Sequence, residues 1–350
     1  MSLKVLLVGL GTRGRHWARV IAENAGATLV AGVDPSLDAV TTLREKLPQL
    51  EFPTRTDLIA ALEEFQPDVV VLSTPPEFHL AQITACAERE IPMLCEKPLA
   101  LDADTARACV EVAERHKIHL GIGMNFRYLE TTRASLEYIQ GGRLGQVGFG
   151  RINYWRYRDG QRPLLNKYPL TMDQPMLLEQ SIHHLDLARF IYGAEVVSVW
   201  GRTTNPPWSM YRSDATVAAW LTFQNGVELQ YFGTWMGTNS KNEFQWRTDG
   251  ADGMLFQRDI FAGLEFWKAG ATTPEEISLA PQEDFVDDTR GLLEDFLCAV
   301  RGEESTYPTG RDHLMTMALT LACAESSKQG KTLDLLEFAQ IGRASCRERV

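Results

Sequence analysis

The sequence has little of what marks a membrane, disulfide-rich or nucleic-acid-binding protein. Its six cysteines in 350 residues are scattered and form no Cys-x-x-Cys pair, so neither a disulfide framework nor a zinc site is expected. No apolar run approaches the roughly twenty residues that span a bilayer. Basic runs are absent and the net charge is −11 at pH 7, which argues against a polyanionic partner. We expect a cytoplasmic protein that binds neither nucleic acid nor membrane.

The last ten residues, 341–350 (IGRASCRERV), do not continue the pattern before them. The segment resembles the translation of a common sequencing-adapter oligonucleotide, so we interpret it as a non-native, adapter-derived tail. A frayed basic tail is the alternative. On the first interpretation the native C-terminus is missing. The remaining length predicts two domains, residues 1–126 and 127–340.

Residues 1–126 alternate short apolar runs with helical patterns. The runs are rich in Val, Leu and Ile and lack polar alternation, as strands buried on both faces should. Between them, apolar residues recur at three- and four-residue spacing in 77–90 and 102–117. This order predicts an α/β domain with a parallel, doubly wound sheet. The expected strands are 4–9, 28–34, 68–75, 92–98 and 119–126.

Residues 127–340 have a different pattern, which predicts antiparallel strands followed by two helices near 287–301 and 310–329. Residues 215–235 predict a hairpin with Asn225-Gly226 as its turn, and Val227, Leu229 and Tyr231 on its packed face. Further strands are expected in 146–158, 242–259 and 263–270. Seven of the eight tryptophans lie in this half, which either a subunit interface or core packing would explain.

A glycine-rich turn follows the first expected strand. Gly9, Gly11 and Gly14 form G-x-G-x-x-G, and a helix is expected to start near Arg13. Gly9 permits the tight turn, Gly11 lets a pyrophosphate approach the backbone, and Gly14 lets helix and strand pack closely. The free N–H groups and the helix dipole then bind the phosphates. The pattern predicts a dinucleotide site.

Asp34 ends the second expected strand, twenty positions after Gly14. A carboxylate there accepts hydrogen bonds from the adenosine ribose and repels a 2′-phosphate, so we predict NAD rather than NADP. Residues 73–79 and 95–98 also follow strands and should lie at the carboxyl edge of the sheet. Lys97 is positioned to donate to a substrate oxygen, or else is a solvated loop lysine.

These motifs resemble those of the Gfo/Idh/MocA oxidoreductase family, and the similarity extends from residue 3 to about 335. The combination of glycine turn, Glu-Lys-Pro and His-x-x-Asp in this order is specific. The family typically has Asp-x-Gly-x-His-x-x-Asp, where this chain has Glu179 for the first Asp and Ser181 for Gly. The matching positions are Gly9, Gly11, Gly14, Asp34, 73–75, His79, 96–98, 125–127 and 179–186.

The resemblance implies an N-terminal Rossmann domain and a C-terminal α+β domain with an open, mostly antiparallel sheet. It also implies a homodimer or homotetramer formed through that sheet, and sugar, inositol or polyol substrates. Lys97 would lie between the substrate hydroxyl and the cofactor, Glu96 near the nicotinamide ribose, and His183 at the reacting oxygen. The predicted cofactor-binding residues are Gly9, Gly11, Thr12, Arg13, Gly14, Asp34, Thr74, Pro75, His79, Glu96 and Lys97.

Residues 179–186 (EQSIHHLD) hold the candidate catalytic histidine. On a helix, Glu179, His183 and Asp186 share one face, whereas His184 points about 100° away. The two histidines therefore do not readily bind one ion, and we predict no metal. We interpret His184 as structural. His183 is the predicted general base, since its ordinary pKa suits the removal of a hydroxyl proton, with Glu179 or Asp186 fixing its tautomer.

The leading hypothesis is an NAD-dependent oxidoreductase that transfers hydride between a sugar, cyclitol or sugar-acid carbon and nicotinamide. Lys97, His183 and Glu179 are the catalytic candidates. Arg127, Arg156 and Asp186 are the candidate substrate contacts, and arginines near the cleft would suit a carboxylate on an acidic sugar. The alternatives are a redox-neutral NAD-dependent glycosidase and a non-catalytic NAD-binding sensor.

Overall fold

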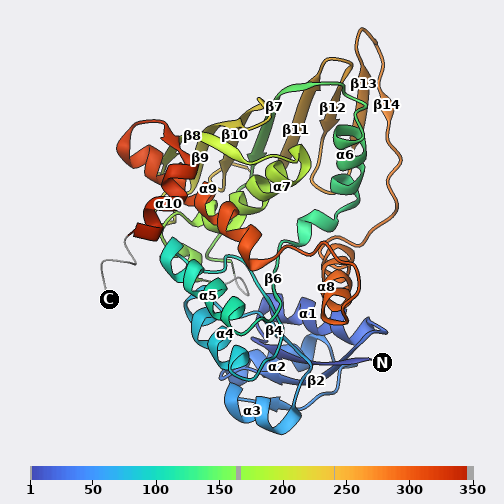
Figure 1. Cartoon of the computed structure of the whole chain (residues 1–350), viewed down its shortest axis with the longest axis vertical. Coiled ribbons are helices and arrows are strands. Elements are labelled where there is room, and N and C mark those ends of the chain that lie inside the picture. Colours follow the sequence, from blue (N-terminus) through green and yellow to red (C-terminus); the bar gives the residue numbers. More distant parts are fainter. Residues whose placement is uncertain (1, 163–166, 240, 345–350) are drawn as a thin grey trace. The chain divides into compact units, whose positions relative to one another are not determined.

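A computed structural model describes residues 2–162, 167–239 and 241–344 of the chain (Figure 1). The chain forms two compact units. The first comprises the residues up to Tyr128 together with 283–314, and the second comprises 129–282 and the residues from Met315 onward. Residues 283–314, which we had assigned to the second domain, thus fold with the first.

The sheet of the first unit is parallel and has the strand order β3-β2-β1-β4-β5-β6. This is the strand order of dinucleotide-binding folds, with the topological switch point between β1 and β4. The predicted strands are present, and a two-residue edge strand, β3, adds to them. The strands are β1 (Leu3–Val8), β2 (Ala27–Val33), β3 (Thr54–Arg55), β4 (Val69–Leu72), β5 (Met93–Cys95) and β6 (Leu120–Ile122).

Several helices of the first unit begin at a side-chain cap. Ser36, Asp57 and Asp102 each accept the backbone N–H three residues ahead, which stabilises the start of α2, α3 and α5. The helices are α1 (Thr12–Glu23), α2 (Leu37–Lys46), α3 (Leu58–Phe65), α4 (His79–Ala87), α5 (Ala103–Arg115) and α8 (Asp287–Val300). Two short 3₁₀ turns, η1 (Pro76–Phe78) and η2 (Asn125–Tyr128), complete it.

Helix α8 belongs to the first unit because its apolar face is part of that unit's core. Leu293, Phe296 and Leu297 are fully buried in one cluster with Val5 of β1 and Trp17 of α1. Burying side chains of this size is worth roughly 1.5–3 kcal/mol each. The packing explains why a helix late in the sequence joins the nucleotide-binding fold.

The second unit is built on a mixed sheet with the order β14-β13-β12-β11-β7-β10-β9-β8-β15. The β7–β10 pair is parallel and the other pairs are antiparallel. The strands are β7 (Val147–Trp155), β8 (Val196–Thr204), β9 (Thr216–Phe223), β10 (Glu228–Thr234), β11 (Glu243–Gly250), β12 (Gly253–Gln257), β13 (Leu264–Lys268), β14 (Glu275–Glu276) and β15 (Leu333–Asp334).

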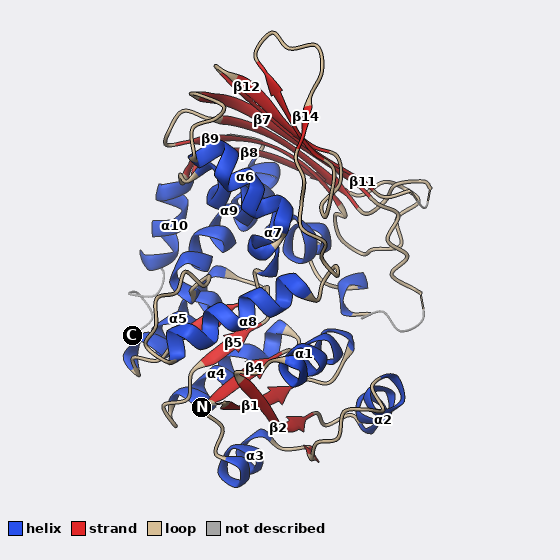
Figure 2. Cartoon of the chain, turned by 90° about the vertical axis from the view of Figure 1, so that its right-hand side faces the viewer, coloured by secondary structure: helices blue, strands red, loops and turns tan. Residues whose placement is uncertain are grey.

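Helices cover one face of this sheet, as Figure 2 shows. The predicted hairpin is present as β9 and β10, and Val227, Leu229 and Tyr231 are buried on its covered side. Gly201 lets β8 approach α9, since a Cβ there would lie 2.3 Å from the carbonyl oxygen of Cys323. The helical segments are α6 (Glu130–Gln140), η3 (Tyr168–Leu170), η4 (Leu177–Ser181), α7 (Ile182–Tyr192), α9 (Gly310–Gln329) and α10 (Leu335–Ala344). The start of α9, up to Leu314, belongs to the first unit.

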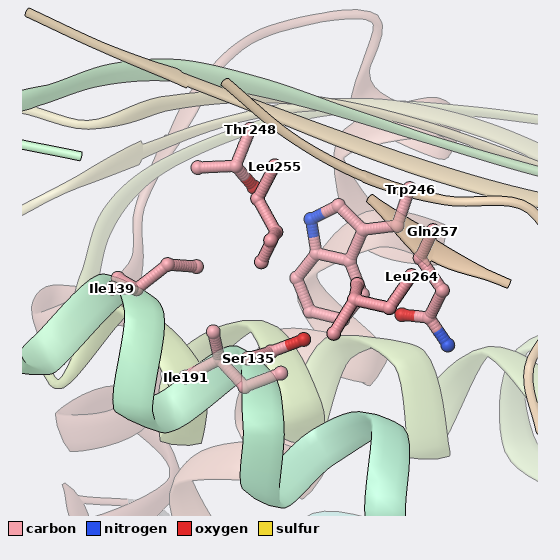
Figure 3. Close-up of a pocket in the computed structure, with 8 residues that line it drawn as sticks. All are labelled: Ser135, Ile139, Ile191, Trp246, Thr248, Leu255, Gln257 and Leu264. Carbon is pink, nitrogen blue, oxygen red and sulfur yellow. The ribbon is translucent and has the colours of Figure 1, made fainter. Parts of the chain in front are cut away.

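A small cavity of about 10 Å³ lies between the helices and the sheet of the second unit (Figure 3). Ser135 and Ile139 of α6 line it from the helix side, and Trp246 and Leu255 line it from the sheet. This volume corresponds to about one water molecule. The cavity is therefore a packing defect of the core rather than a substrate site.

The predicted tail falls partly within α10, whose helix runs to Ala344, while residues 345–350 lie outside the described part of the chain. Its adapter origin stays a prediction. In the residues described, no helix combines the length and the apolar character needed to cross a membrane.

Candidate active site

The glycine turn has the geometry that its spacing predicts. Gly9 has φ +91°, and a Cβ there would lie 2.5 Å from the carbonyl oxygen of Ser73. A Cβ on Gly14 would lie 2.0 Å from the carbonyl oxygen of Gly9. Gly11 instead faces open space, with nothing within 4 Å of its Cβ position. Two glycines therefore close the turn, and the third leaves room for a ligand beside the backbone.

The first turn of α1 is positively charged and has no internal cap. Gly11 is the N-cap, so no side chain accepts the first N–H groups, and the turn has no acidic residue. It carries Arg13 and the half-buried Arg15, whose pKa is lowered by burial. Arg13 Nη2 and Ser73 Oγ are buried, and neither has a hydrogen-bond partner in the described part of the chain. These free donors and the open side of Gly11 fit a dinucleotide pyrophosphate.

Asp34 lies beside this turn, directly after β2. Its Oδ2 accepts the N–H of Leu10 and its Oδ1 accepts the N–H of Ser36, both at 2.8 Å. The carboxylate is therefore fixed next to the glycine turn, and each oxygen keeps a further lone pair for a hydroxyl donor. This arrangement fits an adenosine ribose.

The 73–79 segment is held from inside the unit. His79 is fully buried, with Nε2 2.9 Å from the carbonyl oxygen of Thr74 and Nδ1 3.1 Å from that of Leu99. Burial lowers the pKa of His79. The Thr74 hydroxyl donates to Gln82 at 2.6 Å, and Pro75 precedes η1. His79 therefore braces the two loops that follow β4 and β5, and we predict an indirect effect on cofactor binding.

The Glu-Lys-Pro corner follows β5. Glu96 is 7% exposed, and its Oε1 accepts Arg13 Nε at 2.5 Å and the indole N–H of Trp17 at 2.7 Å. Burial alone would raise the pKa of Glu96, but Arg13, with help from Lys97 and the indole, holds that pKa below its ordinary value. Lys97 is half-buried and precedes a cis bond to Pro98.

Sequence reasoning missed Asp288, which joins this corner from α8. It is 1% exposed and its Oδ2 accepts the side-chain N–H of Asn125. Burial raises the pKa of Asp288 to about 6, against the opposing charge of Arg13. In the sequence, Asp288 has the pattern of an acidic residue in the first turn of a helix, where it interacts favourably with the helix dipole. Only the packing of α8 reveals it.

In the second unit, residues 179–186 begin in a π turn rather than in the regular helix that we expected. The π turn spans Leu177–Ser181 and leads into α7. Its Glu179 accepts the hydroxyl of Tyr168 at 2.7 Å. His183, in the first turn of α7, is 6% exposed. Single π turns occur frequently at functional sites, and this one carries the candidate acid immediately before the candidate base.

His184 is the centre of a buried hydrogen-bond chain. It is fully buried, and burial lowers its pKa to about 3, so the ring is neutral. Nδ1 lies 2.9 Å from the hydroxyl of Tyr231, which donates to Ser181 at 2.9 Å. Nε2 lies 3.3 Å from Gln180 Nε2, and Gln180 Oε1 accepts Tyr154 at 3.5 Å. His184 therefore donates through Nδ1, which supports its predicted structural role.

The predicted substrate contacts differ in their surroundings. Asp186 is 1% exposed and accepts the hydroxyl of Thr316 at 2.8 Å. Arg127 is paired with Asp312 at 2.5 Å. Arg156 is half-buried, and its charge acts to lower the pKa of Tyr154, which burial raises. Of the three, Arg156 has the surroundings that best suit a substrate contact.

The structure thus forms two clusters, one per unit. The first contains the glycine turn, Asp34, the Glu-Lys-Pro corner and Asp288, and the second contains the π turn, His183 and the network beneath it. In the described parts of the chain, no three His, Cys, Asp or Glu side chains are grouped so that they could hold a metal ion.

Comparison with known proteins gives matches over both units. Residues 3–124 match the model of the NAD-binding Rossmann fold of the GFO/IDH/MocA oxidoreductase family, and residues 137–335 match the model of its C-terminal α/β domain. An inositol 2-dehydrogenase from Rhizobium meliloti is 32% identical over 57% of this chain and 58% of its own length. A D-apiose dehydrogenase from Rhizobium rhizogenes is 26% identical over 77% of this chain and 79% of its own length.

Solved structures share the fold. An oxidoreductase from Agrobacterium radiobacter, crystallised with NAD⁺, L-tartaric acid and magnesium, superposes with a TM-score of 0.85. It is 22% identical, and the match covers 96% of this chain and 99% of that one.

Proposed function

Because the chain belongs to the Gfo/Idh/MocA oxidoreductase family, we propose that it is a dehydrogenase that oxidises a hydroxyl carbon of a sugar, cyclitol or sugar acid. Its N-terminal domain is of the NAD-binding Rossmann type. The observation that carries the proposal is an acid and a histidine at a π turn, in the same chain as an open glycine turn. The names of the inositol and apiose dehydrogenases that it resembles support the substrate class.

The first unit would hold the dinucleotide. The N–H groups at the start of α1 would bind the pyrophosphate, with Arg15 beside them, and Asp34 would accept the ribose hydroxyls. NAD⁺, when bound, supplies the hydride acceptor. A carboxylate at position 34 repels a 2′-phosphate, so we propose NAD rather than NADP as the cofactor.

The remaining steps belong to side chains of the protein. Lys97 would donate a hydrogen bond to the reacting oxygen, and the imidazole of His183 would take the hydroxyl proton as hydride leaves the carbon. Glu179 would stabilise the resulting imidazolium, since its carboxylate is held by Tyr168. Glu96 would stay ionised near the nicotinamide ribose, because Arg13 and Trp17 fix it.

The test is a panel of sugars, inositols and sugar acids with NAD⁺ and with NADP⁺, followed by the absorbance of the reduced nicotinamide. His183→Ala should keep NAD⁺ affinity and lose about 10²–10⁴-fold in kcat, the usual contribution of a general base. His116→Ala, at the end of α5, is the control and should keep full activity. Normal turnover by His183→Ala would refute the role of His183. Glycoside cleavage without net NAD⁺ reduction would instead favour the redox-neutral alternative.

We also propose that copies of the chain associate through the uncovered face of the second sheet. Trp155, Trp200 and Trp220 are 45%, 45% and 49% exposed there, and Trp200 and Trp220 are cross-strand neighbours. Exposed aromatic patches are typical of interfaces. Trp220→Glu should lower the mass measured by light scattering after gel filtration.

The cysteines, free in the described residues, support a cytoplasmic location.

A further inference from the structure

We propose that the substrate carries a carboxylate, bound by Arg156 and Arg158 of the second unit. This inference rests on the proposed function and narrows it from sugars and polyols in general to polyhydroxy acids. Both arginines follow the end of β7, two positions apart, and are half-buried.

Arg156 and Arg158 form no ion pair with a carboxylate of the described residues. Most half-buried arginines of the described residues are matched by a carboxylate: Arg13 by Glu96, Arg19 by Glu283, Arg290 by Glu23. Within the described ranges, no carboxylate oxygen lies within 4.0 Å of a nitrogen of Arg156 or Arg158. The chain has 46 acidic and 35 basic residues, so a shortage of acids does not explain this.

The two arginines lie near the same tyrosines. Arg158 Nη1 donates to the hydroxyl of Tyr211 at 3.2 Å. The charges of both arginines act on the pKa of Tyr154 and also on that of Tyr211. Both cations therefore lie within electrostatic reach of both tyrosines. Like charges in one neighbourhood repel each other, and a bound anion lowers that repulsion.

The orientation of Arg158 is fixed before any ligand binds. Its guanidinium stacks over the ring of Trp235 at 4.2 Å, and the Tyr211 hydroxyl donates to its carbonyl oxygen at 2.8 Å. Trp235 is 2% exposed, and its buried indole N–H has no hydrogen-bond partner among the residues that the structure describes. A stacked arginine loses little entropy when its planar fork binds a carboxylate. The indole N–H of Trp235 is therefore a further hydrogen-bond donor beside the guanidinium of Arg158.

Acidic groups in this part of the unit are engaged elsewhere or lie beyond ion-pair distance. Glu179 accepts the Tyr168 hydroxyl, and Asp159, next to Arg158, accepts the N–H of Gln161 at 3.0 Å. Asp159 acts on the pKa of Tyr211, and the charges of Arg158 and Arg156 oppose its effect there.

The arginines are linked to the candidate catalytic segment. Tyr154, which the charge of Arg156 reaches, donates to Gln180 of the π turn at 3.5 Å, next to Glu179. An anion held by Arg156 would therefore lie near the segment that carries Glu179 and leads to His183. The remaining hydroxyls of a polyhydroxy acid would reach that segment.

The experiment uses matched pairs in which a carboxylate replaces a neutral group: D-gluconate with D-glucitol, D-galactonate with D-galactitol, and D-glucuronate with D-glucose. D-Glucose 6-phosphate distinguishes a phosphate from a carboxylate. Each is assayed with NAD⁺ and the whole chain. The variants are Arg156→Gln and Arg158→Gln, with the exposed Arg115→Gln of α5 as control.

We expect the acid of at least one pair to have at least tenfold higher kcat/KM than its neutral partner. Either arginine variant should raise KM for that acid about 10–100-fold, as for loss of a charge-assisted hydrogen bond, and leave KM for NAD⁺ unchanged. Arg115→Gln should keep the preference. The inference would be overturned by a higher kcat/KM for the neutral partners or for D-glucose 6-phosphate. It would also be overturned if both arginine variants kept the preference for the acid.

A binding measurement separates this inference from the proposed function. If none of the panel reduces NAD⁺, the dehydrogenase proposal fails, and titration calorimetry with D-gluconate, D-galactonate and D-glucuronate then decides the anion site. Saturable binding of any of the three that Arg158→Gln abolishes and Arg115→Gln retains would support the site. Absence of binding to the wild-type protein would contradict it.

Discussion

The two candidate clusters are built in different ways. In the first unit, the glycine turn, Asp34 and the Glu-Lys-Pro corner each follow a parallel strand directly, so strand order alone gathers them at one edge. In the second unit, Glu179 lies on a π turn and His183 in the helical turn after it, and the π turn is held by side chains from β7 and β10. One site depends mainly on backbone geometry, and the other on buried side-chain hydrogen bonds.

The helices show the difference in part. Side chains cap α2, α3 and α5 in the first unit, whereas α1, α4 and α8 of that unit, like α6 and α7 of the second, begin without a side-chain cap. Helices without caps depend more on tertiary packing. A substitution that disturbs the packing should therefore affect the second cluster, while the first should be most sensitive to changes of its backbone.

The largest effect is expected for Gly14→Ala in the first unit. The added methyl would lie 2.0 Å from the carbonyl oxygen of Gly9, so α1 or the turn must move. NAD⁺ affinity, measured by calorimetry, should fall by more than tenfold and the melting temperature should drop. Gly11→Ala is the matched control, because its Cβ meets nothing within 4 Å. It should keep the melting temperature and weaken NAD⁺ binding only. Equal melting losses in both variants would contradict the backbone argument.

The same contrast explains which site residues could be predicted from the sequence alone. Gly9, Gly14 and Asp34 were predictable because their chemistry depends on neighbours a few positions away and on strand order. Asp288 was not, because it meets Asn125 only after α8 packs into the first unit. The π turn was not either, since residues 179–186 have an ordinary helical pattern, and partners such as Tyr231 are about fifty positions away.

An intermediate effect is expected for His184→Leu in the second unit. It removes a donor and an acceptor, so the buried Tyr231 hydroxyl and the half-buried Gln180 amide each lose a hydrogen-bond partner. The loss in the free energy of unfolding should be about 2–6 kcal/mol in urea titrations. His184→Gln retains one donor and one acceptor and should recover much of the stability and kcat. If both variants were equally unstable, shape rather than hydrogen bonding would be responsible.

The pH dependence of the free energy of unfolding of the wild-type protein also tests the role of His184. The pKa of His184 is about 3 when folded and ordinarily 6.5, so between these values the unfolded chain binds a proton that the folded chain does not. The free energy of unfolding should therefore fall on acidification below pH 6.5, by up to about 1.4 kcal/mol per pH unit. His184→Gln should lose this contribution, and an unchanged slope would contradict it.

In the first unit, Asp288 should give a smaller pH dependence of the free energy of unfolding, with the opposite sign to that of His184. Burial raises its pKa from 3.8 to about 6, so between these values the folded chain keeps a proton that the unfolded chain has released. Its contribution to the free energy of unfolding therefore falls as pH rises from about 4 to 6, by at most about 3 kcal/mol. Asp288→Asn keeps the size and one acceptor for Asn125, so it should flatten this component in urea titrations at several pH values. Asp287→Asn, with a 40% exposed carboxylate in the same turn, should not. If both substitutions flattened the profile equally, the effect would come from the charge at the start of α8, and the buried acid would lose its distinct role.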